Sequence, residues 1–278
     1  MTTGLAIIGG GAMGRAVAEG ALAADVQTGP LVIAEPDSGR RGGLARLGAT
    51  VVPSAAAAMR ELTRLETAPG QGVILLAVKP QVFRTVVSEL GDVGARPVLS
   101  VMAGVTSAAI RAALGGAARV VRLMPNTPAA VRMGVTGLCA GAGASEEDVA
   151  SAERLFRAVG EVVRVPEDLM DAVTAVSGSG PAYLFYLAEA LEHAAIDAGF
   201  DPNTAARLVR GTLAGAARLL ADGHDPATLR AAVTSKGGTT EAACEVLDAG
   251  AVRGVIQEAV RAATARGAAL SAMVSVPP

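Results

Sequence analysis

The first 165 residues alternate between short apolar runs and longer stretches with a helical pattern, and this alternation restricts the fold more than any other feature of the sequence. It predicts a mostly parallel, doubly wound sheet covered by helices on both faces. The predicted strands are Leu5–Ile8, Leu31–Ala34, Thr50–Val52, Val73–Ala77, Pro97–Ser100 and Arg119–Leu123, with two short strands near Val135–Cys139 and Glu161–Val165 that would extend the sheet. The helices predicted between them are Ala12–Ala24, Ser38–Leu47, Ala55–Leu65, Gln81–Leu90, Ser107–Leu114 and Glu146–Val159.

The pattern changes after Pro166, where β-branched runs largely stop and apolar residues recur with a helical period. The predicted helices are Ala182–Ala198, Pro202–Asp222, Pro226–Val233, Thr240–Asp248 and Ala251–Leu270. Their broad faces, rich in Ala and Gly, suit helices that pack closely, including helices of another subunit. We therefore predict two domains: an α/β Rossmann-type domain over residues 1–165, and an all-α dimerisation and substrate domain over residues 166–278.

The composition excludes several classes of function. A net charge of −2, with only four Phe and two Tyr, provides neither the positive surface nor the stacking platforms of a nucleic-acid-binding protein. Two Cys and two His do not form a disulfide framework, and we predict no metal site. The longest uncharged stretch, Ala172–Ala188, is interrupted by Gly178-Ser179-Gly180-Pro181, and the first eight residues contain no basic segment. We therefore expect a cytoplasmic protein with no membrane segment.

A glycine-rich segment joins the first predicted strand to the first predicted helix. Its sequence, Gly9-Gly10-Gly11-Ala12-Met13-Gly14, has the G-x-G-x-x-G spacing in the context that dinucleotide binding requires. Gly9 permits the tight turn, Gly11 lets the backbone approach a pyrophosphate, and Gly14 lets the helix pack on the strand. The phosphates would lie at the helix N-terminus, beside Ala12 and Met13, where free N–H groups and the helix dipole favour anions.

Glu35 follows the second predicted strand, 21 residues after Gly14. An acidic residue there usually binds the adenosine ribose hydroxyls and disfavours a 2′-phosphate, which favours NADH. Arg40 and Arg41 lie just beyond it and are able to hold a 2′-phosphate, which favours NADPH. The remaining interpretation is an exposed loop acid followed by a solvated pair of arginines.

Two further turns should face the same ligand, because ligands of open parallel sheets lie beyond the carboxyl ends of the strands. Ala77-Val78-Lys79-Pro80 follows the fourth strand, and Lys79 either contacts a ribose or lies in solvent. Met124-Pro125-Asn126-Thr127-Pro128 follows the sixth strand, and its two prolines restrict the turn. Asn126 either steers the nicotinamide end of the cofactor or satisfies the backbone of its own turn.

The segment Thr234-Ser235-Lys236-Gly237-Gly238-Thr239-Thr240 joins two predicted helices of the second domain. Two glycines that expose backbone N–H groups, followed by two threonines at a helix start, predict a site for a small carboxylate. The alternative is an interhelical turn with a capping threonine. None of these loops contains a His, a Cys or a pair of carboxylates, which favours a substrate that is already electrophilic and needs only hydride delivery and orientation.

Taken together, these segments resemble the Δ1-pyrroline-5-carboxylate reductase family, the last enzymes of proline synthesis. The resemblance covers essentially the whole chain, and its most specific part is the run from Pro226 to Asp248. The segments that carry it are Gly9–Gly14, Ala77–Gln81, Ala103-Gly104-Val105, Met124–Pro128, Ala175–Tyr183 and Pro226–Asp248. It implies a Rossmann domain and a helical domain that interlocks with its partner in a dimer, with dimers often assembling into decamers.

The resemblance also implies the chemistry: hydride transfer from NAD(P)H to the C=N carbon of 1-pyrroline-5-carboxylate. It places the substrate carboxylate on Ser235 and on the backbone N–H groups around Gly238, Thr239 and Thr240. It also places the Thr240 hydroxyl on the ring nitrogen. Lys236 stands where the family usually has proline, which adds a positive charge to the loop. The cofactor preference that is usual in this family favours NADPH, whereas Glu35 leaves NADH open as the cofactor.

Two alternatives remain open. One is a related imine or 3-hydroxyacid dehydrogenase with the same architecture, which the Ser235–Thr240 loop and the lack of a catalytic lysine motif disfavour. The other is a non-catalytic NAD(P)-binding sensor that oligomerises through its helical half. We predict Thr240 as the catalytic residue, Ser235, Gly237, Gly238, Thr239 and Thr240 as the substrate site, and Gly9, Gly11, Ala12, Met13, Gly14, Glu35, Ala77, Val78, Lys79, Pro80, Ala103 and Asn126 as the cofactor site.

Overall fold

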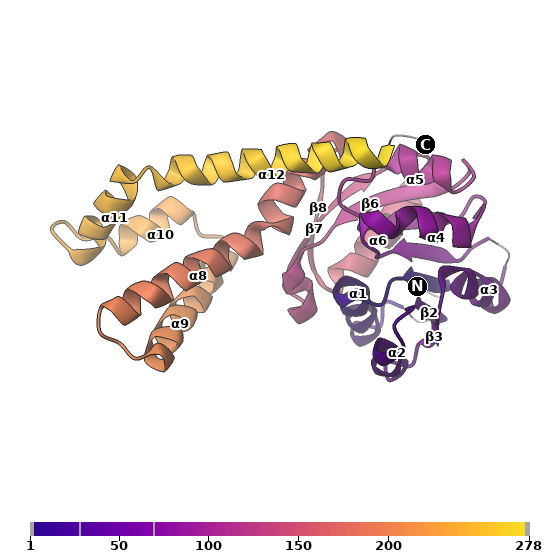
Figure 1. Cartoon of the computed structure of the whole chain (residues 1–278), viewed down its shortest axis with the longest axis horizontal. Helices are drawn as coiled ribbons and strands as arrows, with labels where there is room; N and C mark the ends of the chain where they lie inside the picture. The colour runs from indigo at the N-terminus through magenta and orange to yellow at the C-terminus, as the bar shows by residue number, and fades with distance from the viewer. Residues whose placement is uncertain (1–2, 28, 69, 276–278) are drawn as a thin grey trace. The chain divides into compact units, whose positions relative to one another are not determined.

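The computed structural model describes residues 3–27, 29–68 and 70–275. They form two packing units (Figure 1): a first unit of Met1–Ser179 with Ala263–Pro278, and a second unit of Gly180–Ala262. Residues 166–179 and the C-terminal part of the last helix thus belong to the unit that contains the sheet. The predicted functional division into residues 1–165 and 166–278 stays a prediction.

The first unit is built on an eight-stranded sheet with the order β3-β2-β1-β4-β5-β6-β7-β8. Neighbouring strands are parallel except β6 and β7, which are antiparallel. All eight predicted strands are present, and their ends differ from the prediction by at most one residue. The strands are β1 (Leu5–Ile8), β2 (Leu31–Ala34), β3 (Thr50–Val52), β4 (Val73–Leu76), β5 (Pro97–Ser100), β6 (Arg119–Met124), β7 (Gly134–Ala140) and β8 (Gly160–Arg164).

Helices cover both faces of this sheet, which explains why its central strands β1, β2, β4 and β5 are buried along their whole length. Alternate residues of β1 belong to different buried clusters: Leu5 and Ile7 to one, Ala6 and Ile8 to the other. The first cluster contains residues of α1 (Ala12–Ala23), α2 (Ser38–Ala45) and α6 (Glu146–Arg157). The second contains residues of α3 (Ala55–Leu65), α4 (Phe83–Leu90) and α5 (Ser107–Ala113). The prediction of a doubly wound sheet is confirmed.

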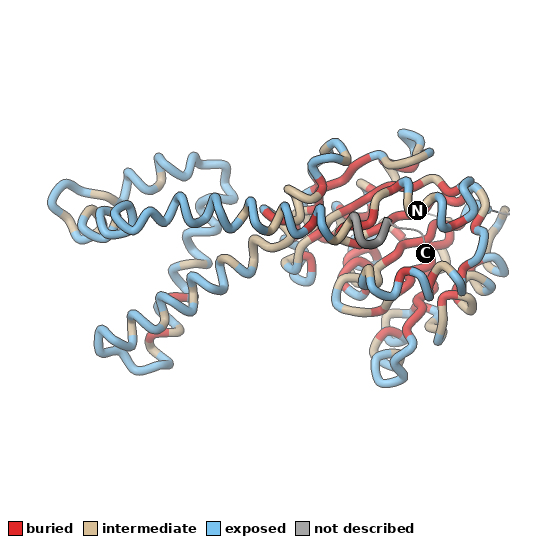
Figure 2. The backbone as a smooth tube through the Cα atoms, turned by 45° about the horizontal axis from the view of Figure 1, so that its top comes forward, coloured by how far each residue is buried: buried red, intermediate tan, exposed pale blue. Residues whose placement is uncertain are grey.

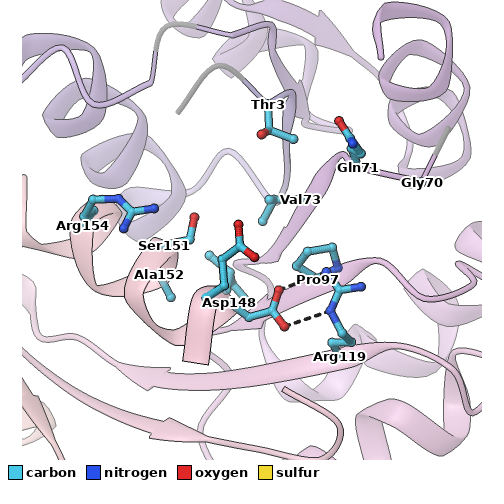
Figure 3. A pocket seen from close by; sticks show the side chains of 12 residues that line it. Thr3, Gly70, Gln71, Val73, Pro97, Arg119, Asp148, Ser151, Ala152 and Arg154 are labelled. Carbon is cyan, nitrogen blue, oxygen red and sulfur yellow. Dashed lines mark hydrogen bonds and ion pairs between the residues drawn. The ribbon is translucent and has the colours of Figure 1, made fainter. Parts of the chain in front are cut away.

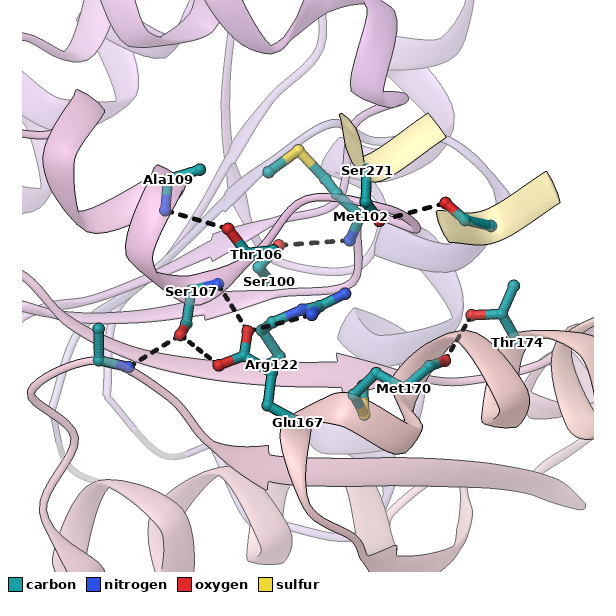
Figure 4. A network of polar contacts seen from close by, with 12 residues as sticks. Ser100, Met102, Thr106, Ser107, Ala109, Arg122, Glu167, Met170, Thr174 and Ser271 are labelled. Carbon is teal, nitrogen blue, oxygen red and sulfur yellow. Dashed lines mark hydrogen bonds and ion pairs between the residues drawn. The ribbon is translucent and has the colours of Figure 1, made fainter. Parts of the chain in front are cut away.

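Three short helical turns that the sequence did not predict follow β8: η3 (Glu167–Leu169), α7 (Met170–Val173) and the π-helical turn η4 (Thr174–Gly178). Glu167 ties this segment to the sheet (Figure 4), because its carboxylate accepts hydrogen bonds from Ser107 N at 2.8 Å, Ser107 Oγ at 2.6 Å and Arg122 Nη1 at 3.0 Å. Partial burial raises the pKa of this carboxyl, but the hydrogen bonds and the Arg122 charge outweigh burial and hold it below its ordinary value.

The second unit is entirely helical. Its helices are α8 (Gly180–Asp197), α9 (Pro202–Ala221), α10 (Pro226–Ala232), α11 (Thr239–Ala249) and the first part of α12 (Val252–Ser275). Asp201 and Asp225 cap α9 and α10 by accepting hydrogen bonds from first-turn N–H groups. Figure 2 colours most of these helices as exposed. Large apolar side chains are among the exposed residues, since Phe185 is 65% and Tyr186 76% exposed. Across the described residues, every helix is too short or too polar to cross a membrane.

One cavity of about 500 Å³ lies at the amino ends of the central strands (Figure 3). It is lined by Val73, Pro97 and Arg119, and by Asp148 of α6, whose carboxylate accepts a hydrogen bond from Arg119 Nε at 2.8 Å. Because parallel sheets bind ligands at the opposite edge, this cavity is separate from the predicted site.

Candidate functional site

The loop after β1 has two glycines that packing requires and one that it does not. Gly9 has a φ of +108°, and a Cβ there would lie 2.6 Å from Ala77 O. A Cβ on Gly14 would lie 2.0 Å from Gly9 O. A Cβ on Gly11, by contrast, would have no described atom within 4 Å. The backbone at Gly11 therefore faces open space, as a loop that lies against a pyrophosphate must.

The first turn of α1 begins at this loop. Gly11 is the N-cap residue, and no described side chain caps the helix. The first N–H groups of α1, from Ala12 and Met13 onward, thus point toward the open side of Gly11, where the helix dipole adds positive potential. The residues of this loop fit a dinucleotide.

Glu35 is not an exposed loop acid, so that interpretation was wrong. The residue is 3% exposed, and its Oε1 accepts a hydrogen bond from Asp37 N at 2.9 Å. The carboxylate lies against the glycine loop, since a Cβ on Gly10 would be 3.1 Å from Glu35 Oε2. Glu35 therefore lies at the position from which an acid in this fold binds a ribose.

The two arginines after Glu35 behave differently from each other. Arg41 Nη1 donates hydrogen bonds to the backbone oxygens of Glu35 at 3.1 Å and Pro36 at 2.8 Å, so this side chain supports the turn. Arg40 is exposed and pairs loosely, its Nη1 lying 3.9 Å from Glu35 Oε2. Arg40 also lines a pocket of about 580 Å³ beside the glycine loop. Arg15 and Arg46 line the same pocket, and the sequence analysis missed both of them.

The other predicted cofactor residues lie at the carboxyl ends of neighbouring strands. Ala77 and Val78 contact Gly9, since a Cβ on Gly9 would lie 3.0 Å from Val78 Cγ1. Lys79 is exposed and precedes the 3₁₀ turn η1 (Pro80–Val82). Ala103 follows β5 beside Gly104, which has a φ of +71° and packs against the last turns of α12 in the same unit. The sheet thus brings these residues to one edge of the first unit.

The hydrogen bonds of Asn126 reach beyond its own turn, and its role at the nicotinamide end of the cofactor stays a prediction. Its Oδ1 accepts a hydrogen bond from Val135 N at 2.9 Å, and its Nδ2 donates to both O and Oγ of Ser177 at 3.3 Å. Asn126 therefore connects the turn after β6 to β7 and to the π-helical turn η4. π-Helical turns inside longer helices often occur at functional sites. The contact with Ser177, 51 residues away, leaves no signal in the sequence.

The Ser235–Thr240 loop of the second unit is shaped by its own hydrogen bonds. Gly237 has a φ of +73°, and its N–H donates to Glu241 Oε2 at 2.6 Å. The N–H of Gly238 donates to Ser235 O at 3.0 Å. The expectation that both glycines expose free N–H groups was therefore wrong. The donors that remain are those at the start of α11, where Gly238 is the N-cap residue and Thr239 and Thr240 form the first turn without a side-chain cap.

Ser235 lies against this helix start. A Cβ on Gly238 would be 2.5 Å from Ser235 Oγ and 3.0 Å from Ser235 O, so a larger residue at position 238 would shift the hydroxyl from this place. A serine hydroxyl and two threonines thus surround the positive end of an 11-residue helix.

Comparison with known proteins decides the family. The family model "NADP oxidoreductase coenzyme F420-dependent" matches residues 4–104, and the model "Pyrroline-5-carboxylate reductase dimerisation" matches residues 167–270. A pyrroline-5-carboxylate reductase of Synechocystis sp. is 40% identical, covering 96% of this chain and 97% of the relative. One of Mycobacterium tuberculosis is 38% identical, covering 94% and 95%. The chain belongs to the pyrroline-5-carboxylate reductase family.

Solved structures of the pyrroline-5-carboxylate reductase family match the fold over nearly its whole length. The structure from Coxiella burnetii has a TM-score of 0.86 at 35% identity, covering 98% of this chain and 99% of that one. The structure from Plasmodium falciparum, solved with NADP bound, has a TM-score of 0.82 at 25% identity, covering 97% and 98%. A reductive aminase from Aspergillus terreus, 19% identical with a TM-score of 0.57, shares the fold alone. The resemblance seen in the sequence is confirmed.

Proposed function

We propose that this chain reduces 1-pyrroline-5-carboxylate to L-proline with a reduced nicotinamide nucleotide. One observation carries the proposal: a chain that matches reductases of this name over at least 94% of its length has both required loops. The first unit provides an open glycine loop at a helix start, and the second provides a small-anion site at another helix start.

In the first unit, Gly9, Gly11 and Gly14 shape the loop, and the first turn of α1 holds the pyrophosphate. Glu35 binds the adenosine ribose, and the edge formed by Ala77, Val78, Lys79, Pro80 and Ala103 holds the remainder of the nucleotide. Asn126 acts behind this edge by fixing the π-helical turn through Ser177. When bound, the reduced nicotinamide supplies a hydride to the C=N carbon of the substrate.

In the second unit, the Ser235 hydroxyl and the N–H groups at the start of α11 hold the substrate carboxylate, with Gly237 and Gly238 setting the path of the loop. The Thr240 hydroxyl orients the ring nitrogen. As the carbon accepts the hydride, the C=N π electrons become a lone pair on that nitrogen, which keeps the proton of the iminium form. A protonated imine is electrophilic without a strong general acid, which agrees with loops that contain none.

For the nucleotide we propose NADPH over NADH. Glu35 opposes a 2′-phosphate, but Arg40 Nη1 lies 3.9 Å from its Oε2 and reduces that repulsion. The pocket beside the glycine loop carries three arginines, which favours the nucleotide with the extra phosphate.

The exposed apolar side chains of the second unit support a homo-oligomer, proposed as an interlocked dimer able to assemble further into a decamer. Leu184 is 57% and Phe185 65% exposed on α8, and an apolar surface of this kind is costly in water unless a partner covers it. Both cysteines are free, which suits the reducing cytoplasm proposed as its location.

A spectrophotometric assay tests the function. Purified protein is mixed with 1-pyrroline-5-carboxylate and either NADPH or NADH, and nucleotide oxidation is followed together with the amount of L-proline formed. We expect one proline for each nucleotide oxidised, with a higher kcat/KM for NADPH. A 3-hydroxyacid with the oxidised nucleotides is the control for the alternative dehydrogenase. Binding of nucleotide without proline formation would favour a non-catalytic sensor.

A further inference from the structure

The last helix, α12, begins in the second unit and ends in the first, to which its residues from Ala263 onward belong. Two glycines lie inside it, Gly254 and Gly267, although glycine destabilises a helix relative to alanine. A Cβ on Gly254 would have no described atom within 4 Å, whereas a Cβ on Gly267 would lie 3.2 Å from Asp171 Oδ1 and 3.3 Å from Asp171 Cβ. Close packing inside the first unit therefore accounts for Gly267 and not for Gly254.

The same turn of α12 also lies against the loop after β5. Gly104 in that loop has a φ of +71°, and a Cβ there would lie 3.2 Å from Ser271 N and 3.5 Å from Gly267 O. Ser271 (Figure 4) lies one turn after Gly267, and its Oγ donates a hydrogen bond to Gly267 O at 3.1 Å. Gly104 and Gly267 are both buried, so two stretches of backbone without side chains meet at this point.

Each of the two segments that α12 contacts contains or leads to a predicted cofactor residue. The loop after β5 contains Ala103, directly before its contact with α12. Asp171 belongs to α7, which continues into the π-helical turn η4. In that turn, O and Oγ of Ser177 each accept a hydrogen bond from Asn126 Nδ2 at 3.3 Å. The end of α12 thus lies against both segments, which are far apart in the sequence.

The strand order identifies the part of the nucleotide concerned. The order β2-β1-β4-β5-β6 puts Glu35, after β2, on one side of the glycine loop, and puts Ala103 and Asn126, after β5 and β6, on the other. Because the acid after β2 marks the adenosine ribose, the nicotinamide ring belongs at the ends of β5 and β6. Resting on the nucleotide-dependent function proposed above, we propose that Gly267 is a positioning residue, whose close packing fixes the two segments that hold the nicotinamide ring.

A side chain at position 267 would move the end of α12 away from Asp171, and with it the backbone that packs on Gly104. The glycine loop has its own close contact, between Gly9 and Ala77, so the pyrophosphate would keep its site. The nucleotide would then still bind, with its ring displaced from the substrate. Hydride transfer is sensitive to such a change, since a misplacement of about 1 Å costs on the order of 100-fold in rate.

Gly267→Val tests this inference by steady-state kinetics. Valine is a better helix former than glycine, so a loss of activity would reflect packing rather than helix propensity. We expect kcat for pyrroline-5-carboxylate reduction to fall about 10- to 100-fold, at a temperature where the melting curve shows a folded protein. Gly267→Ala adds one methyl group and should cause a smaller loss, which keeps the test open if valine prevents folding.

Nucleotide binding gives a readout that a loss of stability alone would not move. Isothermal titration compares NADPH with 2′-phospho-ADP-ribose, which lacks the nicotinamide ring. We expect wild type to bind NADPH about tenfold more tightly than this fragment, because the ring adds contacts. In Gly267→Val the preference should fall below about twofold, with the affinity for the fragment unchanged.

Two variants serve as controls. Ala268→Val adds a β-branched side chain at the exposed neighbour of Gly267, and should preserve both kcat and the preference for NADPH. Asp171→Ala removes the carboxyl group that a side chain at position 267 would meet. Combined with Gly267→Ala, it should restore part of the lost kcat, because residues in contact have non-additive effects.

Wild-type kcat in Gly267→Val would overturn the inference, as would an equal loss of affinity for NADPH and for the fragment. An equal fall of kcat in Ala268→Val would also overturn it. A wild-type protein that prefers NADPH over the fragment but forms no proline would overturn the proposed function. In that case, loss of the preference in Gly267→Val would still support the inference, and an unchanged preference would overturn it.

Discussion

The two units of the chain bury their apolar residues to very different extents. The first unit encloses two buried clusters, one on each face of its sheet. In the second unit, all of whose residues are described, the buried apolar residues are Ala205 and Val209 alone. Both units are rich in Leu, Val and Ala, so composition does not explain the difference. The first unit carries its own core, and the second presents a surface that only a partner can complete.

The same difference extends to the two candidate loops. A Cβ on Gly9 would lie 2.6 Å from a backbone oxygen, and a Cβ on Gly14 would lie 2.0 Å from another. The backbone around the nucleotide loop is therefore packed so closely that both positions require glycine. The Ser235–Thr240 loop is held by local bonds, such as that from Gly237 N to Glu241. We therefore expect the nucleotide loop to keep its shape in an isolated protomer, and the substrate loop to depend on assembly.

The largest effect is expected from Gly11→Val, which tests the independence of the first unit. The valine side chain would occupy the open space beside the first turn of α1, so nucleotide binding should weaken at least on the order of 100-fold. Because no described atom lies within 4 Å of that Cβ, the melting temperature should change little. Titration with NADPH beside a melting curve measures both, and unchanged nucleotide affinity would remove this loop from the site.

Phe185→Glu tests the dependence of the second unit on a partner. Phe185 is 65% exposed, and a symmetric dimer would bury this side chain in both protomers. Burial of each Phe185 side chain would stabilise the dimer by about 1.5–3 kcal/mol. Sedimentation velocity should show dissociation at concentrations where wild type is assembled. Leu22→Glu, at a 36% exposed position of the first unit, is the matched control and should not change the assembly. Wild type that sediments as an active monomer would contradict the comparison.

Thr240→Ala examines the substrate loop itself. If the hydroxyl stabilises the ring nitrogen during hydride transfer, its loss should raise the activation free energy by about 2–4 kcal/mol and lower kcat accordingly. The KM for the nucleotide should be nearly unchanged. Ser235→Ala should mainly raise the KM for the substrate, because the carboxylate is the same in ground and transition states. A Thr240→Ala protein with wild-type kcat and a lowered melting temperature would show that Thr240 acts only at the helix start.

The smallest effect is expected from Glu167→Gln, which removes the charge that ties the segment after β8 to Ser107 and Arg122 of the first unit. The carboxyl pKa lies below its ordinary value in the folded protein, so the ionised group stabilises the fold above its unfolded pKa. That stability is lost as the pH falls through the folded pKa. We expect Glu167→Gln to melt a few degrees lower than wild type near neutral pH, with the difference disappearing in acid. A difference that persists at low pH would mean that side-chain shape, rather than charge, matters at this position.

The sheet could be predicted from the sequence because its central strands are buried on both faces and therefore read as short apolar runs. The glycine loop could be predicted because its spacing follows from local backbone geometry. The contact between Asn126 and Ser177 could not, since it joins residues 51 positions apart. The approach of Gly267 to Asp171 depends on how the end of α12 packs within the first unit, and the occupied N–H groups of Gly237 and Gly238 depend on the φ angles of one turn.

The central claim is that a nucleotide held by the first unit reduces pyrroline-5-carboxylate held by the second. Isotope transfer tests it most directly. NADPH with deuterium at both C4 positions is incubated with the substrate and the protein, and the product is analysed by mass spectrometry. We expect L-proline that carries a single deuterium, at the ring carbon that was double-bonded to nitrogen. Nucleotide oxidation without deuterium at that carbon, or no proline at all, would contradict the account.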